Sequence, residues 1–172
     1  MMSEIWDLYD SMGRKSEFTK DRHSSEPIPD GLYHMVCDIL VIHEDGTYLL
    51  TKRHDNKEVY PGYWEASAGG SAVSGESPLK CAVRELFEET GISVTADDLE
   101  LVGHSFSEKS RSVFYSYIVR VNCKKDSVVL QEGETVAYKW VNKEEFLEYV
   151  DSDEAIKSHN ARYEKYIETL RK

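Results

Sequence analysis

The fold of this chain is decided by one stretch of its sequence, Gly70-Ser-Ala-Val-Ser-Gly-Glu76-Ser-Pro-Leu-Lys-Cys-Ala-Val-Arg84-Glu85-Leu86-Phe-Glu88-Glu89-Thr-Gly91-Ile92. Within it, Ser77–Thr90 is predicted to form a helix. Pro78 suits the first helical turn, and Gly91 follows as a C-terminal stop. One face of this helix is apolar and is expected to pack on a sheet; it carries Leu79, Ala82, Val83 and Leu86.

A second face of the predicted helix is acidic. Glu85, Glu88 and Glu89 stand at positions i, i+3 and i+4, so their carboxylates share one side of the helix. Like charges at this spacing destabilise a helix by about 0.2–0.5 kcal/mol per pair, and only Arg84 is a near partner. Bound Mg²⁺ or Mn²⁺ would offset the repulsion, because both ions prefer hard oxygen ligands. The alternative interpretation is a solvated acidic surface.

The whole stretch resembles the signature of the Nudix hydrolase family. That signature reads Gly-x5-Glu-x7-Arg-Glu-U-x-Glu-Glu-x-Gly-U, where U is a bulky aliphatic residue, and residues 70–92 match it at every position. Seven positions are fixed, so at roughly 7% usage each a chance match is on the order of 10⁻⁸ per starting position. The surroundings agree with the resemblance, since Pro61-Gly62-x-Trp64-Glu65 precedes the stretch and Trp140-Val141 closes a later predicted strand.

The resemblance implies a role for each matching residue. The metal ligands would be Glu85, Glu88, Glu89 and the backbone carbonyl of Gly69. Glu76 and Arg84 would lie behind these ligands, with Arg84 orienting the glutamates through ion pairs. Without the resemblance, Glu76 is interpreted only as a carboxylate near the positive end of a helix.

The implied activity is that of a metal-dependent pyrophosphohydrolase acting on phosphoric anhydrides. We expect the substrate to be a nucleoside diphosphate linked to another moiety, and the cofactor to be Mg²⁺ or Mn²⁺. Divalent ions neutralise a diphosphate and lower the pKa of an attacking water. A carboxylate then accepts the proton of that water. Glu85 is one candidate base, Glu134 in a predicted loop is a second, and its neighbour Glu132 is a third.

Substrate-binding residues are predicted upstream of the acidic helix. Lys52-Arg53-His54 forms a basic island in an acidic chain, and such groups bind phosphates. Arg53, at the end of a predicted strand, is the strongest candidate, and Lys52 is the next. Trp64 is a candidate for stacking on a nucleobase. The alternative interpretation is a solvated loop for the basic residues and a core position for the tryptophan.

Strand patterns flank the predicted helix on both sides. They cover Tyr33–His43, Thr47–Lys52, Leu99–Ser107, Ser112–Val121 and Val136–Val141. Strands before and after one central helix favour an α+β fold. The resemblance narrows this class to a Nudix α/β/α sandwich with a mixed central sheet, an N-terminal arm and an extra C-terminal helix.

We expect one domain over residues 1–172, with the arm at 1–31, the core at 32–150 and the extra helix at 151–172. The arm is polar and is interpreted as a connection beyond a short strand at Ile5–Tyr9. In the last segment, Asp153–Leu170 is predicted as one helix with an apolar stripe that needs a partner. Both segments are expected to pack outside the sandwich, one of them beside the substrate cleft, in a chain that forms a homodimer.

Composition limits the possible partners. The chain has 172 residues, and its 21 Lys and Arg against 32 Asp and Glu give a net charge of −11. So much negative charge disfavours nucleic acid and anionic membranes as partners. The resemblance to the Nudix family implies a small-molecule diphosphate as the expected partner. No apolar run approaches the roughly 20 residues that span a bilayer. The acidic N-terminus and three widely spaced cysteines predict a cytoplasmic protein without disulfides or a zinc site.

Two other functions compete with hydrolysis. Trp6-Asp7, Tyr33-His34 and Lys52-Arg53 also resemble isopentenyl-diphosphate isomerase, but Ser67-Ala68-Gly69-Gly70 lacks the cysteine of that enzyme. A non-catalytic ligand sensor on the same scaffold is disfavoured because all the glutamates of the signature are present. The substrate stays open among nucleoside triphosphates, nucleotide sugars, dinucleoside polyphosphates and isoprenoid diphosphates.

Overall fold

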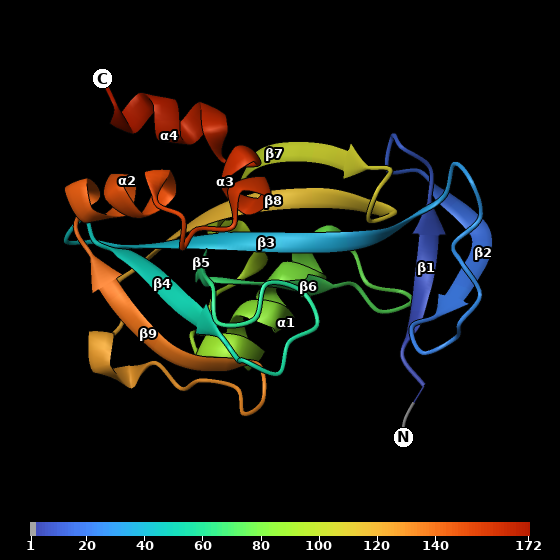
Figure 1. The fold of residues 1–172 in the computed structure, drawn as a ribbon, viewed down its shortest axis with the longest axis horizontal. Helices are drawn as coiled ribbons and strands as arrows, with labels where there is room; N and C mark the ends of the chain where they lie inside the picture. The colour runs from blue at the N-terminus through green and yellow to red at the C-terminus, as the bar shows by residue number, and fades with distance from the viewer. Residues whose placement is uncertain (1–2) are drawn as a thin grey trace.

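The computed structural model describes residues 3–172, and their strands form one mixed sheet (Figure 1). The strands are β1 (Ile5–Tyr9), β2 (Lys15–Asp21), β3 (Tyr33–His43), β4 (Tyr48–Arg53), β5 (Trp64–Ala66), β6 (Ala68–Ser71), β7 (Leu99–Ser107), β8 (Ser112–Val121) and β9 (Thr135–Val141). Within the described chain, the α-helices are α1 (Pro78–Thr90), α2 (Lys143–Asp151), α3 (Lys157–Ala161) and α4 (Glu164–Leu170). The predicted strands and the predicted signature helix are all present.

Strand β3 is the centre of the sheet. Along one edge it pairs in parallel with β8, from His34 opposite Ser112 to His43 opposite Val121. Along its other edge it pairs antiparallel with β6, where Cys37 lies opposite Gly70 and Asp38 lies opposite Gly69. This pairing fixes the start of the Nudix-like stretch against the middle of the sheet.

The two faces of the sheet carry separate cores. Alternate residues of β3 point to opposite faces, as expected for a strand. Cys37 and Ile39 join Leu86 of α1 in one buried cluster, whereas Leu40 joins Phe146 of α2 in the other. Figure 1 shows α1 on one side of the sheet and α2, α3 and α4 on the other. The α+β class and the α/β/α layers are therefore confirmed.

The N-terminal arm is more ordered than its polar sequence predicts. Strand β2 forms inside the segment that was expected to be a connection, and it pairs antiparallel with β1. In turn, β1 joins β3 at Leu8 opposite His34. Most of β2 is solvent-exposed, so its sequence carries no apolar alternation by which a strand is recognised. The arm is thus a hairpin that extends the sheet.

The prediction of one continuous helix over Asp153–Leu170 is wrong. The segment forms two short helices, α3 and α4, with a break at Arg162 and Tyr163. At this break, Arg162 pairs with the buried Asp38 of β3. The apolar stripe of the segment is buried all the same, because Tyr163 and Ile167 belong to the same hydrophobic cluster as α2. Across residues 3–172, no helix is both long and apolar enough to cross a membrane.

Candidate active site

The acidic helix begins and ends as its sequence predicts. The Ser77 side chain accepts a hydrogen bond from the Lys80 N–H at 3.3 Å, and Pro78 is the first helical residue. Gly91 ends the helix in the left-handed region, at φ 71°, which glycine adopts without steric cost. These two ends fix the length of α1 and therefore the side of the helix on which its glutamates lie.

Arg84 connects four acidic or carbonyl groups. Its Nε and Nη2 atoms donate to the two carboxylate oxygens of Glu76 at 2.6 and 2.8 Å. Its Nη1 atom donates to Glu85 at 2.6 Å and to Glu88 at 3.1 Å, while Nη2 also reaches the Ser71 carbonyl. The structure thus brings Glu76 and Arg84 together with two of the predicted metal ligands. Glu76 is part of this network and not merely a carboxylate near the helix start.

Gly69 and Glu89 face each other across the gap between the sheet and α1. The buried Glu89 carboxylate accepts a hydrogen bond from the Gly69 N–H at 3.1 Å. The backbone N–H of Ala72 donates to the Met35 carbonyl. Because hydrogen-bonded and non-hydrogen-bonded pairs alternate along an antiparallel ladder, Gly69, opposite Asp38, makes no backbone hydrogen bond to β3 through its N–H or C=O. The Gly69 carbonyl therefore points to the same side as its N–H. That side is the one occupied by the helix carboxylates, as the predicted ligand set requires.

The next residue, Gly70, lies against a side chain of α1. A Cβ atom on Gly70 would push the carboxylate of Glu85 out of its present position. The signature glycine therefore makes room for an acidic side chain of α1 directly against the strand.

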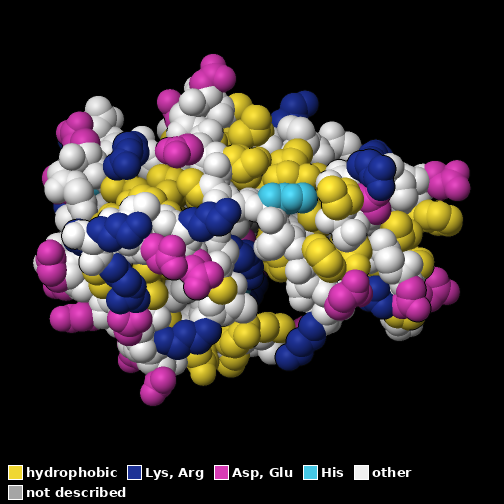
Figure 2. All heavy atoms as spheres, turned by 90° about the horizontal axis from the view of Figure 1, so that it is seen from above, with side chains coloured by type: hydrophobic (Ala, Val, Ile, Leu, Met, Phe, Trp, Pro, Cys, Tyr) yellow, Lys and Arg dark blue, Asp and Glu magenta, His cyan; other side chains and the backbone are white. Residues whose placement is uncertain are grey.

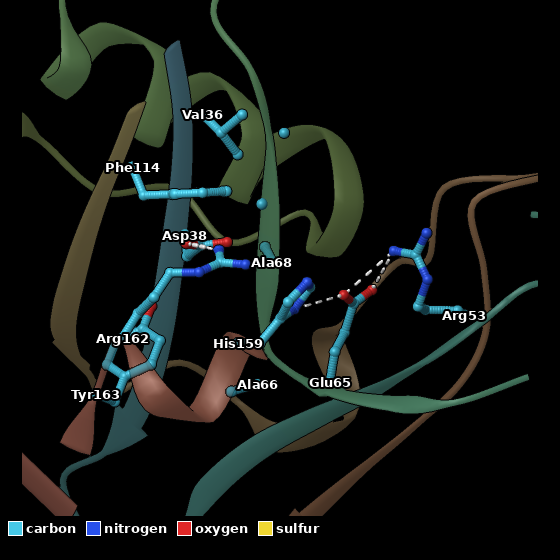
Figure 3. A pocket seen from close by; sticks show the side chains of 12 residues that line it. Val36, Asp38, Arg53, Glu65, Ala66, Ala68, Phe114, His159, Arg162 and Tyr163 are labelled. Carbon is cyan, nitrogen blue, oxygen red and sulfur yellow. Dashed lines mark hydrogen bonds and ion pairs between the residues drawn. The ribbon is translucent and has the colours of Figure 1, made fainter. Parts of the chain in front are cut away.

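Glu65 belongs to the same acidic group, and the sequence analysis did not single it out. It is 7% exposed and lies within 3.2 Å of Arg53 Nη1 through both carboxylate oxygens. His159 of α3 lies on its other side, with Nδ1 at 3.5 Å (Figure 3). The signal was present, since the residue stands in Pro61-Gly62-x-Trp64-Glu65 and strand alternation places it on the face opposite Trp64.

The buried carboxylates repel one another. Burial raises the pKa of Glu89 well above its usual range, and the charges of Glu65 and Glu85 raise it further. Burial also raises the pKa of Glu85 and of Glu65, against the opposing effect of Arg84 and of Arg53 respectively. Without a cation, this group of acids is electrostatically unfavourable in the folded protein.

The donor set suits a hard divalent cation. It offers carboxylates and a backbone carbonyl, which are the ligands that Mg²⁺ and Mn²⁺ prefer. In residues 3–172, however, no three acidic, histidine or cysteine side chains already converge in a metal-binding geometry. The reason is visible in the ion pairs, because Arg84 holds Glu85 and Glu88 while Glu89 is hydrogen-bonded to Gly69. A bound cation would have to compete with Arg84 for two carboxylates.

The candidate bases differ in position. Glu134 is half-buried, forms an ion pair with Lys57, and its charge contributes to the raised pKa of Glu89. Glu132 is exposed. The structure therefore places Glu134 beside the buried acids, and Glu85 is already among them.

The three predicted substrate-binding residues do not form one group. Arg53 lines a cavity together with Glu65 and Gly69. Lys52 of β4 lies opposite Trp64 of β5. The next pair along the two strands is Thr51 and Glu65, so the side chains of the two pairs point to opposite faces of the sheet. Lys52 and Trp64 line a separate depression with Pro61-Gly62 and Asp153-Glu154. The Trp64 ring also contacts Lys139, whose Nζ lies 4.4 Å from the ring centre. Lys52 and Trp64 therefore lie apart from Arg53, and their role in substrate binding stays a prediction.

The N-terminal hairpin holds the loop that leads into α1. Asp7 of β1 accepts hydrogen bonds from the Ser74 hydroxyl and the Gly75 N–H, both at 2.8 Å, and pairs with Lys15 at 2.7 Å. The Ser74 N–H donates to the Ile5 carbonyl at 2.7 Å. The arm is therefore attached to the loop of the Nudix-like stretch.

We expect Asp7→Asn to destabilise the protein by about 1–3 kcal/mol at neutral pH, because charged hydrogen bonds are lost. Burial raises the pKa of Asp7, but Lys15, Gly75 and Ser74 outweigh it, and the pKa is lowered overall. A lowered folded-state pKa gives stability that is present above the unfolded pKa and is lost as the pH falls through the folded value. Urea unfolding at pH 7 and pH 3 should show a large difference between wild type and Asp7→Asn only at pH 7. The exposed Asp126→Asn is the control, and equal effects of the two variants would contradict the role of Asp7.

Comparison with known proteins agrees with this geometry. The NUDIX domain family model matches residues 32–167, which includes most of the C-terminal segment. A Nudix hydrolase of Listeria monocytogenes is 33% identical over 144 residues, covering 83% of this chain and 82% of that protein. The nucleoside triphosphatase NudI of Salmonella arizonae is 30% identical over 125 residues, covering 67% and 85%. The crystal structure of DR0079 from Deinococcus radiodurans aligns with a TM-score of 0.70 at 20% identity, covering 98% of both chains.

The chain therefore belongs to the Nudix family. Its place among these hydrolases makes it a pyrophosphohydrolase.

Proposed function

We propose that this protein is a metal-dependent hydrolase that cleaves the diphosphate bond of a nucleoside diphosphate linked to another moiety. The observation that carries the proposal is the buried acidic group around Glu89, which accepts a hydrogen bond from the Gly69 N–H and whose charges repel one another without a cation. The name of the NudI relative, a nucleoside triphosphatase, supports a nucleotide substrate.

The residues that would hold Mg²⁺ or Mn²⁺ are Glu85, Glu88, Glu89 and the carbonyl of Gly69. An ion bound there supplies charge neutralisation of the diphosphate and acidifies the attacking water. Arg84, fixed by Glu76, keeps the glutamates oriented, as outer-shell partners do.

The proton of the attacking water goes to a carboxylate of this chain. We assign this role to Glu134, with Glu85 as the second candidate, because both lie among the buried acids and Glu132 is exposed. Lys57 is paired with Glu134 and holds that carboxylate in place. Arg53 serves the substrate indirectly, by holding Glu65, and directly, from the wall of the cavity.

The isomerase alternative is weakened by the state of the thiols. Cys37 and Cys81 lie beneath the site, and both are fully buried. The hydrogen bond between them and the burial of the pair raise the pKa of Cys37, so it is not a ready proton donor or acceptor at neutral pH.

We further propose that residues 1–172 act as one unit in the cytoplasm, where the three free cysteines would stay reduced. The homodimer stays a prediction.

The proposed function is tested with a panel of diphosphates in the presence of Mg²⁺ or Mn²⁺. It should contain nucleoside triphosphates, nucleotide sugars, dinucleoside polyphosphates and isopentenyl diphosphate, with products resolved by phosphorus NMR. We expect cleavage between two phosphorus atoms to give two phosphorylated products. Isomerisation of isopentenyl diphosphate, or cleavage of no compound in the panel, would contradict the proposal.

A further inference from the structure

The N-terminal hairpin of β1 and β2 lies outside the part of the chain that the family model matches, which begins at residue 32. It extends the sheet at the right of Figure 1. Residues 3–31 carry four Lys or Arg against seven Asp or Glu, and Figure 2 shows acidic and basic side chains side by side at this end of the molecule. A net negative surface repels a polyphosphate, so the hairpin is not a phosphate-binding surface. It contacts instead the turn that leads into α1.

This turn is attached to the hairpin through its exposed centre. It spans Val73-Ser-Gly-Glu76 and is closed by a hydrogen bond from the Glu76 N–H to the Val73 carbonyl at 3.0 Å. The two central residues, Ser74 and Gly75, are exposed, so packing does not hold them. Three hydrogen bonds attach them to β1, two to the Asp7 carboxylate at 2.8 Å and one to the backbone at 2.7 Å. Asp7 itself is only 4% exposed.

The carboxylate of Glu76, at the end of the turn, determines how Arg84 divides its donors. Two bonds of the guanidinium go to Glu76, at 2.6 and 2.8 Å, and one goes to the Ser71 carbonyl at 3.1 Å. Nη1 donates to Glu85 and Glu88, at 2.6 and 3.1 Å. A guanidinium has five N–H donors in a fixed plane. The three that are held by Glu76 and Ser71 are therefore kept away from the proposed metal ligands.

The division matters because a cation competes with Arg84 for Glu85 and Glu88. While Glu76 holds the guanidinium, these two carboxylates need to release only the bonds of Nη1 to bind a cation. If Glu76 shifts, the freed donors of Arg84 turn toward Glu85 and Glu88, and the competition becomes stronger. Loss of the turn's attachment therefore weakens cation binding without removing any of the proposed ligands.

A second contact of the hairpin supports the other acceptor of Arg84. The Trp6 indole of β1 stacks on the His34 imidazole, with ring centres 4.1 Å apart and an angle of 14° between the planes. The Nδ1 atom of His34 lies 3.3 Å from the hydroxyl oxygen of Ser71, whose carbonyl accepts from Arg84. Strand β1 thus borders both supports of the guanidinium, the turn and the end of β6.

We propose that the hairpin sets the affinity of the site for its cation, and that Asp7 is the positioning residue through which it does so. This inference rests on the proposed function, in which the carboxylates of α1 hold Mg²⁺ or Mn²⁺. Asp7 fixes the turn, the turn fixes Glu76, and Glu76 limits the competition of Arg84 with the cation.

Asp7→Asn is the sharpest variant. An asparagine has one acceptor oxygen, so it cannot keep both Ser74 and Gly75 bound. The ion pair with Lys15 is lost as well. Ser74→Ala is a second, milder variant at an exposed side chain, and it removes only the bond of that hydroxyl to Asp7.

Asp21→Asn is the matched control. Asp21 lies in the same hairpin, but its carboxylate accepts from the Ser3 hydroxyl and the His23 N–H and not from the turn. Any general loosening of the hairpin by loss of one carboxylate therefore appears in this variant too.

Mn²⁺ binding is measured from the electron paramagnetic resonance signal of free Mn²⁺, at a temperature at which circular dichroism shows every variant folded. Mutation of a group that orients metal ligands weakens metal binding about 10–100-fold, and Asp7 acts one contact further away. We expect Asp7→Asn to weaken Mn²⁺ binding about three- to tenfold and Ser74→Ala about twofold, with Asp21→Asn like wild type. Turnover of Asp7→Asn at saturating Mn²⁺ should recover to near that of wild type, a separation that a merely structural role does not produce.

A double-mutant cycle tests the route through Glu76. Asp7→Asn and Glu76→Gln should not be additive in their effect on Mn²⁺ affinity, because both release the same donors of Arg84. Full additivity would overturn the role of Asp7. So would unchanged Mn²⁺ affinity in folded Asp7→Asn and Ser74→Ala, or an equal loss in Asp21→Asn.

The same measurements separate this inference from the proposed function. Wild type that binds Mn²⁺ but cleaves no diphosphate would overturn the proposed function alone, because the Mn²⁺ affinities of the variants still decide the role of Asp7. Wild type that cleaves diphosphates while Asp7→Asn binds Mn²⁺ normally would overturn this inference alone. Wild type that binds no Mn²⁺ would also overturn it.

Discussion

Glu89→Gln is expected to lower turnover on the order of 10²–10³-fold and, at the same time, to stabilise the metal-free protein. Glu89 is buried between Gly69 and the other acids, and its raised pKa shows that its charge is unfavourable there. Glutamine removes that charge and keeps the shape. Loss of a preorganised charge at a reacting centre has an effect of the stated size on turnover.

The effect on stability is measured by urea unfolding at pH 7 in the presence of chelator. The unfolding midpoint of Glu89→Gln should exceed that of wild type. A carboxyl whose folded-state pKa is raised costs stability above its unfolded pKa, and this cost disappears as the pH falls. The gain should therefore shrink toward pH 4. Glu148→Gln, on the exposed side of α2, is the control and should change neither quantity. A lower unfolding midpoint for Glu89→Gln would assign Glu89 to a structural ion pair.

Arg162→Met is expected to destabilise the protein by about 3–5 kcal/mol, a large part of the stability of a single domain. The side chains of Arg162 and Asp38 are 10% and 9% exposed, and removing the cation leaves an unpaired buried carboxylate. The stacking of Arg162 on Phe114 is lost as well. Adding Asp38→Asn to the same chain should recover much of the loss, because a neutral amide is cheaper to bury than a charge.

The control for this prediction is an Arg–Asp pair at the surface. Arg171 pairs with Asp151 at 2.7 Å, and their side chains are 44% and 63% exposed. Exposed ion pairs contribute about 0–1 kcal/mol, so Arg171→Met should be nearly neutral. Equal losses for Arg162→Met and Arg171→Met in urea unfolding would show that the buried pair does not hold the C-terminal segment to the sheet.

The sequence was sufficient for the elements whose residues follow a local rule. Tyr33–His43 and Ser112–Val121 have the alternation or apolar content of strands and form β3 and β8 with the predicted bounds. Ser77 and Gly91 mark the ends of α1 by capping chemistry, which depends only on neighbouring residues. Helix geometry also fixes the spacing of Arg84 and the acidic face within α1, whereas Glu76 precedes the helix and contacts Arg84 through the fold.

What the sequence did not predict depends on contacts between distant segments. The break in the C-terminal helix follows from the pairing of Arg162 with Asp38, 124 positions away. Glu65 comes near Glu89 only in the folded chain, and its place in Pro61-Gly62-x-Trp64-Glu65 does not by itself show that proximity. The separation of Lys52 from Arg53 follows from the strand pleat, which sends neighbouring side chains to opposite faces.

The central claim is that hydrolysis depends on a divalent cation held by the carboxylates of α1. The most direct test measures turnover of the best diphosphate substrate after exhaustive chelation and then during titration with Mg²⁺ or Mn²⁺. We predict no turnover in excess chelator, recovery on adding either ion, and a weakened ion dependence in Glu88→Gln and Glu89→Gln. Full turnover in excess chelator would contradict the account.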